Sequence, residues 1–132
     1  MQVGAGADDA VHLGGATKQD NTFTNTDVFD YSDAGHDNWR MGGSRWQVPD
    51  IASGDTVNAA SVQIYVQSAT RDDMRADWYC EAVDDAAAFA TGGVDDMINR
   101  PATATVNWTA DALGAGWVTT PSLVTPVQAV FN

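Results

Sequence analysis

The side chains of this 132-residue chain that are best suited to recognition are aromatic rings. Two tryptophans stand beside polar or glycine residues in loop-like surroundings, and two tyrosines stand at outward positions of predicted strands. Exposed rings can stack on sugars, and packing at a core rim or a protein interface explains such residues equally well. The candidate ligand-binding residues are Trp39, Tyr65, Tyr79 and Trp117.

Pairs of adjacent aspartates form a second group that could do chemistry, as oxygen ligands of calcium. No loop has ligands at the regular alternate positions of an EF-hand, and turns, caps and solvated charge account for most such pairs. Asp84 and Asp85 are the best-placed metal candidates because a predicted strand ends there. Calcium aside, we expect no cofactor.

Few residues of the sequence are suited to catalysis. A zinc site would need His12 and His36 together with carboxylates, because Cys80 alternates with apolar residues and is expected in the core. No nucleophile-elbow motif is present, and Asp is so abundant that a carboxylate pair of the glycosidase type carries no information. We therefore expect no catalytic residues and no enzymatic activity.

The net charge of −12 narrows the choice of partners. The acidic residues are seventeen Asp and one Glu, a bias that fits a β protein rich in turns. A field this negative repels phosphate backbones, so nucleic acid and anionic membranes are not expected partners. The sequence shows no signal peptide and no apolar run long enough to cross a bilayer, and its single cysteine allows no internal disulfide.

These residues must be positioned by β-strands. The clearest covers residues 102–109, where small or apolar residues alternate with Thr and Asn without a slip. Weaker alternation predicts the remaining strands, separated by polar loops at residues 14–25 and 32–38 and by a turn at residues 49–55. These strands cover residues 9–13, 26–31, 40–48, 56–67 and 76–83. We expect the last two to pair with each other.

The strand faces also predict a core, in which Trp46, Ile64, Trp78 and Trp108 are nearly buried. Trp117 falls at the end of a glycine-containing loop.

Short helical segments complete the prediction. Residues 84–89, capped by Asp84, and residues 94–99 are expected to form helical turns. Thr125, Pro126 and Gln128 have the spacing of a capping box, so a helix is predicted to begin at Pro126. Such a short helix is marginal unless it docks on the sheet, or unless the natural polypeptide continues.

Several of these segments, in the same order, resemble a jelly-roll-like β-sandwich domain related to carbohydrate-binding modules. The resemblance covers residues 46–130, and its elements are residues 48–65, 81–89, 100–108, 121–123 and 127–128. Such domains occur in large secreted bacterial proteins and in structural proteins of tailed viruses. The family continues past the helix with a Trp-Gly-Asn turn and a final strand, which this sequence does not contain.

We therefore expect an all-β fold, with residues 1–132 forming a single antiparallel β-sandwich of jelly-roll type with short helices, in which that final strand is missing. The function expected first is a non-enzymatic structural or decoration protein on a virion surface, in capsid or tail, because virion proteins need no secretion signal. The alternative is a carbohydrate-binding or adhesion module of a larger extracellular protein. The expected partners are other copies of the chain, a larger assembly, or a glycan.

Overall fold

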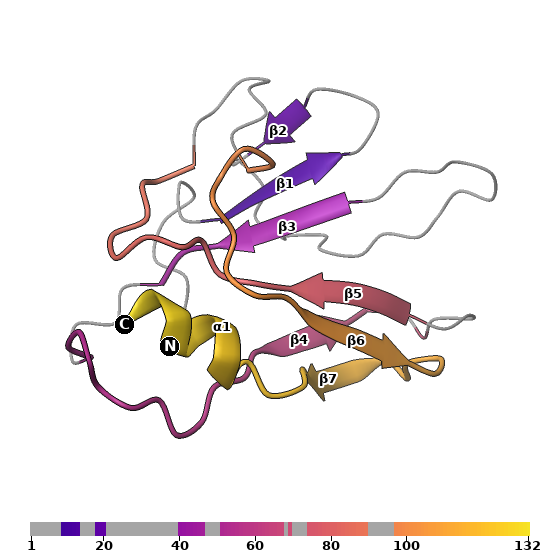
Figure 1. Cartoon of the computed structure of the whole chain (residues 1–132). Coiled ribbons are helices and arrows are strands. Elements are labelled where there is room, and N and C mark those ends of the chain that lie inside the picture. Colours follow the sequence, from indigo (N-terminus) through magenta and orange to yellow (C-terminus); the bar gives the residue numbers. More distant parts are fainter. Residues whose placement is uncertain are drawn as a thin grey trace. The chain divides into compact units, whose positions relative to one another are not determined.

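The structure is a computed structural model that describes residues 9–13, 18–20, 40–46, 51–67, 69, 74–89 and 97–132 (Figure 1). Within these ranges the chain forms seven strands in antiparallel sheets and one short helix, so the all-β prediction is confirmed at the coarser level of a mostly-β chain. The elements are β1 (Asp9–Leu13), β2 (Lys18–Asp20), β3 (Arg40–Ser44), β4 (Gln63–Val66), β5 (Met74–Trp78), β6 (Val106–Ala110), β7 (Gly116–Thr119) and α1 (Val124–Val130).

The chain divides into two compact units. The first unit comprises Met1–Pro49 and Asp85–Arg100, and the second comprises Asp50–Asp84 and Pro101–Asn132. The second unit is therefore built from two segments that the first interrupts. That residues 1–132 form a single domain stays a prediction.

In the first unit, β1 is the central strand of a three-stranded antiparallel sheet, with β2 and β3 on either side. Val11 lies opposite Asp20 on one neighbour and Gly42 on the other. β1 has the predicted bounds, but β2 lies inside residues 14–25, which were predicted as a loop. A three-residue polar strand has no hydrophobic alternation to reveal it, and pairing with β1 is what makes it a strand. The strand predicted at residues 26–31 lies outside the described residues.

Residues 84–89 do not form the predicted helical turn. Arg45 donates a hydrogen bond to the carbonyl of Ala86 (3.1 Å), and Arg100 donates to the next two carbonyls (2.8 and 3.1 Å). The two guanidinium groups thus satisfy oxygens that a helix would have paired with its own N–H groups. Of the second predicted helical segment, residues 97–99 form a turn.

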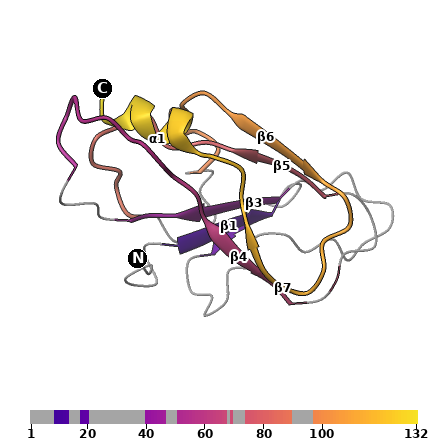
Figure 2. The same ribbon diagram turned by 90° about the horizontal axis from the view of Figure 1, so that it is seen from below.

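The second unit contains two two-stranded antiparallel sheets, β4 with β7 and β5 with β6 (Figures 1 and 2). The predicted pairing of residues 56–67 with residues 76–83 is therefore wrong. Trp117, predicted in a loop, lies in β7. Alternation assigns each side chain to a face of its strand but does not choose the neighbouring strand, because either pairing turns the same faces inward.

The strand predicted over residues 102–109 is shorter than its sequence pattern. β6 alternates half-buried and exposed residues as predicted, with Trp108 on the half-buried side. Upstream the pattern reverses, since Thr103 is half-buried and Ala104 is exposed. The Cys80 N–H donates to the Thr103 hydroxyl (3.0 Å), and the Thr103 N–H donates to the Cys80 carbonyl (2.9 Å). A hydroxyl that completes backbone bonding therefore displaces the apolar residue from the inner face.

Helix α1 begins two residues before the predicted start, and the predicted capping box is wrong. Leu123 is its N-cap, and no side chain caps the first turn. Pro126 lies within that turn, where its missing N–H has no helical partner to lose.

Gln128, the predicted capping partner, joins α1 to the segment that precedes β4. Its side-chain oxygen accepts from the Val57 N–H (2.7 Å), and its amide donates to the Asp55 carbonyl (2.9 Å). The predicted turn at this segment is present, since the Asp55 N–H donates to the Ala52 carbonyl (3.1 Å) and Gly54 has a φ of +87°. The Gly54 N–H then donates to the Phe131 carbonyl (2.7 Å), which satisfies the end of the helix.

The four residues predicted to form a nearly buried core are less buried than predicted. Trp46 is 39% exposed, whereas Ile64, Trp78 and Trp108 are half-buried. Trp78 and Trp108 pack against each other with ring centroids 6.3 Å apart. Both stay half-buried because a two-stranded sheet is too narrow to cover an indole completely. Among the described residues, the buried side chains are Met97 in the first unit and Thr120, Leu123 and Pro126 in the second. The core of the second unit thus lies where β7 leads into α1.

Candidate functional site

The outer face of β4 and β7 carries the two most exposed large aromatic side chains of the described residues. Trp117 is 69% exposed and Tyr65 is 61% exposed, and the two residues lie directly opposite each other in the ladder. Their half-buried neighbours Ile64 and Val118 occupy the other face. Rings this exposed gain little from burial, so their contribution to the core does not explain their presence.

The two rings pack edge to face on each other. The ring centroids of Tyr65 and Trp117 are 5.3 Å apart, and the ring planes meet at 69°. This edge-to-face geometry is favourable for aromatic pairs and is worth about 1 kcal/mol. The contact favours this orientation of the indole, in which most of the ring stays exposed to a ligand.

A polar pair lies beside the aromatic pair on the same face. Gln63 lies opposite Thr119, and its side-chain amide donates to the Thr119 hydroxyl (3.4 Å). Two residues along a strand span about 7 Å, so these groups lie about one sugar ring away from the aromatic pair. The bond leaves the Gln63 carbonyl oxygen and the Thr119 hydroxyl hydrogen available to a ligand. We call Gln63, Tyr65, Trp117 and Thr119 together the aromatic face.

The distribution of charge along the sequence marks this face and is a signal from which it could have been predicted. No Asp, Glu, Lys, Arg or His occurs in residues 56–70 or 112–132, although the whole chain has a net charge of −12. The structure pairs these two segments with each other through β4 and β7, and through the bonds of Gln128. The aromatic face therefore lies on two segments without charged side chains in an otherwise acidic chain.

Of the four predicted contact aromatics, the structure brings Tyr65 and Trp117 together. Tyr79 follows β5 in the other sheet of the second unit and is 37% exposed. Burial, and then the nearby Asp77 carboxylate, raise the pKa of Tyr79, so its hydroxyl stays protonated at neutral pH. Trp39 lies outside the described residues.

The predicted metal ligands lie in a bend. Asp84 and Asp85 are both exposed, and the described part of the chain contains no group of three or more His, Cys, Asp or Glu side chains that could hold an ion. His12 lies in β1 and His36 lies outside the described residues. Burial raises the pKa of the Cys80 thiol, which disfavours the thiolate needed for nucleophilic attack.

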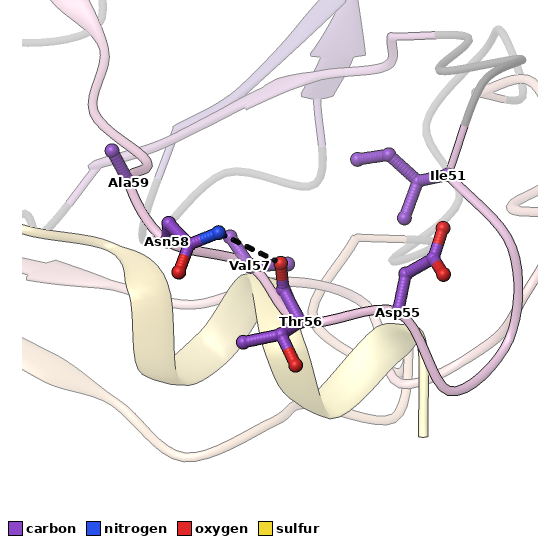
Figure 3. Close-up of a pocket in the computed structure, with 6 residues that line it drawn as sticks. All are labelled: Ile51, Asp55, Thr56, Val57, Asn58 and Ala59. Carbon is purple, nitrogen blue, oxygen red and sulfur yellow. Dashed lines mark hydrogen bonds between the residues drawn. The ribbon is translucent and has the colours of Figure 1, made fainter.

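An open depression of about 460 Å³ lies beside α1 and is lined by Ile51 and residues 55–59 (Figure 3). Its single carboxylate, on Asp55, accepts a hydrogen bond from the Ala52 N–H (2.9 Å) and so closes the turn. The Asn58 amide is turned along its own segment toward the Thr56 carbonyl (3.5 Å). The polar groups of this depression therefore serve the local backbone and do not converge on a ligand.

Among the described residues, no helix is long and apolar enough to span a membrane. The chain was also compared with protein-family models, with curated proteins and with solved structures, and none of them matches it.

Proposed function

We propose that this chain is a non-enzymatic recognition module that binds carbohydrate through the aromatic face. The observation that carries the proposal is the exposed Tyr65–Trp117 pair, held at 5.3 Å beside an uncharged amide and hydroxyl. An apolar ring face flanked by such groups matches a sugar, which offers C–H groups on its faces and hydroxyls at its edge.

The absence of catalysis is part of the proposal. Acid–base or nucleophilic chemistry needs a titratable group or an activated nucleophile beside the bound substrate. The aromatic face offers an amide, a hydroxyl, a phenol and an indole, and β4 and β7 carry no charged side chain. These groups can orient a sugar but are poor proton donors and acceptors at neutral pH.

A sandwich arrangement of the second unit belongs to the same proposal. It is supported by antiparallel pairing and by the alternation of half-buried and exposed residues along β4, β6 and β7. The half-buried faces of the two sheets would then pack on each other. Nuclear Overhauser effects between Ile64 or Val118 and Trp108 test this packing, and their absence would contradict the sandwich and its jelly-roll form.

Affinity electrophoresis in gels that contain polysaccharides tests the function. We expect at least one carbohydrate to retard the wild-type chain, and Trp117→Ala to weaken the binding at least tenfold, which is about 1.4 kcal/mol. Trp46→Ala removes an exposed tryptophan of the first unit and is the matched control. If no carbohydrate in a broad panel retards the wild-type protein, or if both variants bind equally well, the proposal is wrong.

A structural or decoration role on a virion surface is the second candidate. The exposed Tyr65–Trp117 pair also suits packing against another protein, since aromatic residues are enriched at such contacts. Neighbouring reading frames for capsid, portal and tail proteins would support this role. A long reading frame of repeated modules would instead support an extracellular binding module.

A further inference from the structure

We infer that the ligand of the aromatic face is an uncharged, solvated glycan chain, and neither an acidic polysaccharide nor the flat surface of a crystalline one. The inference rests on the proposed function and narrows its substrate class. Three features carry it: the angle between the two rings, the position of the polar pair, and the distribution of charge.

The angle between the rings excludes a flat surface as the preferred ligand. A crystalline polysaccharide presents parallel sugar rings in one plane, so several aromatic rings must be coplanar to stack on it together. The planes of Tyr65 and Trp117 meet at 69°, and only one of them can lie flat on such a surface. A free chain can place one sugar on the indole and pass its edge along the tyrosine.

The polar pair indicates that the ligand extends along the strands. Gln63 and Thr119 lie two residues from Tyr65 and Trp117 along β4 and β7. A sugar stacked on the indole would bring a hydroxyl of the next sugar near the Gln63 amide and the Thr119 hydroxyl. Both groups are uncharged and can donate and accept, as a sugar hydroxyl can.

The distribution of charge selects a neutral ligand. An anionic polymer would meet the field of a chain with a net charge of −12, and no cationic side chain occurs in residues 56–70 or 112–132 to pair with it. A neutral chain is not repelled, and its binding involves no exchange of counterions. Its affinity should therefore be nearly independent of salt.

The test compares three classes of carbohydrate at low and at physiological ionic strength. Soluble neutral polysaccharides are mixed-linkage β-glucan, xylan, galactomannan and amylose, and soluble acidic ones are polygalacturonate and alginate. Microcrystalline cellulose and crystalline chitin, used in pull-down assays, are the insoluble class. We expect retardation by a neutral soluble chain, with a dissociation constant that changes less than twofold with salt.

The variants separate the face from the fold. Trp117→Ala should weaken the binding at least tenfold, and Gln63→Ala by about threefold, while Trp117→Phe keeps a ring and an intermediate affinity. Trp46→Ala should bind as the wild type does. Circular dichroism and thermal unfolding establish whether each variant is folded. If Trp117→Ala is unfolded, the affinity of Trp117→Phe provides the test of the aromatic face.

The outcomes are distinct. Binding only to acidic polysaccharides or only to crystalline ones, lost in Trp117→Ala, would overturn this inference and leave the proposed function standing. No binding to any carbohydrate would overturn both. Dimerisation of the wild type in analytical ultracentrifugation that Trp117→Ala abolishes would show that a second copy covers the aromatic face, and would also overturn both.

Discussion

At the scale of single residues, hydrogen bonding to the backbone decides how far Thr103 is buried, against the hydrophobic pattern of its segment. The alternation at residues 102–109 correctly predicted the inner side of β6 at Trp108 but placed Thr103 outside. A binary pattern treats Thr as polar and cannot foresee that its hydroxyl will serve the N–H of Cys80, which lies 23 residues away in sequence. The burial of a hydroxyl therefore depends on which backbone groups need a hydrogen-bond partner, and the sequence pattern does not give that information.

Thr103 allows that conclusion to be measured. Thr103→Val keeps the shape of the side chain but removes the acceptor for the Cys80 N–H, which should lower the free energy of unfolding by about 1–2 kcal/mol. Thr103→Ser retains the hydroxyl and should lose less. Urea denaturation of the three proteins compares them, and a valine variant as stable as wild type would contradict the role of this bond.

Cys80 predicts a loss of stability at alkaline pH. Burial raises its pKa in the folded chain above the ordinary value of 9.0, so the folded state holds the proton more tightly than the unfolded state. The resulting stability is complete below pH 9.0 and is lost as pH rises through the folded pKa. The free energy of unfolding should therefore fall more steeply as pH rises above 9.0 in the wild type than in Cys80→Ser. Equal slopes would contradict this prediction.

At the scale of elements, the sequence predicted the composition of strands better than their partners. The bounds of β1 and the faces of β4 follow from local alternation, which depends on neighbouring residues alone. The pairing of β4 with β7 could not be predicted in this way, because it joins residues 50 to 56 positions apart in the sequence. The aromatic face had the same difficulty: Tyr65 and Trp117 were singled out separately, and only the ladder makes them a pair.

Two substitutions in α1 distinguish the predicted capping box from the hydrogen bonds that the structure shows. Gln128→Ala removes the hydrogen bonds to Val57 and Asp55 and should cost about 1–3 kcal/mol. Thr125→Ala removes the residue predicted as N-cap, which is exposed and does not cap the helix, and should be neutral or slightly stabilising. Thermal unfolding of the pair distinguishes the two arrangements, and the opposite order of stability would restore the capping box.

At the scale of the whole molecule, acidic charge is absent from the two segments that carry the surface proposed to bind, residues 56–70 and 112–132. With a net charge of −12 the folded chain repels itself, so added salt should stabilise it by screening. Raising NaCl from about 10 to 200 mM at pH 7 should raise Tm by about 4 °C, which is roughly 1 kcal/mol for a chain of this size. The same titration near pH 4.1, where the net charge is close to zero, should change Tm little. An equal shift at both pH values would mean that self-repulsion is not the cause.

The long-range pairing of β4 with β7 also fixes when the binding surface comes into existence. The bond between Gln63 and Thr119 spans 56 residues and that between Val57 and Gln128 spans 71, and closing such loops slows folding. During translation, Tyr65 is synthesised before residues 85–100 and Trp117 after them, so half of the aromatic pair waits for its partner while these residues are made. The fraction of chains that an immobilised glycan captures, followed over time during refolding, would therefore report the rate at which the second unit completes its folding.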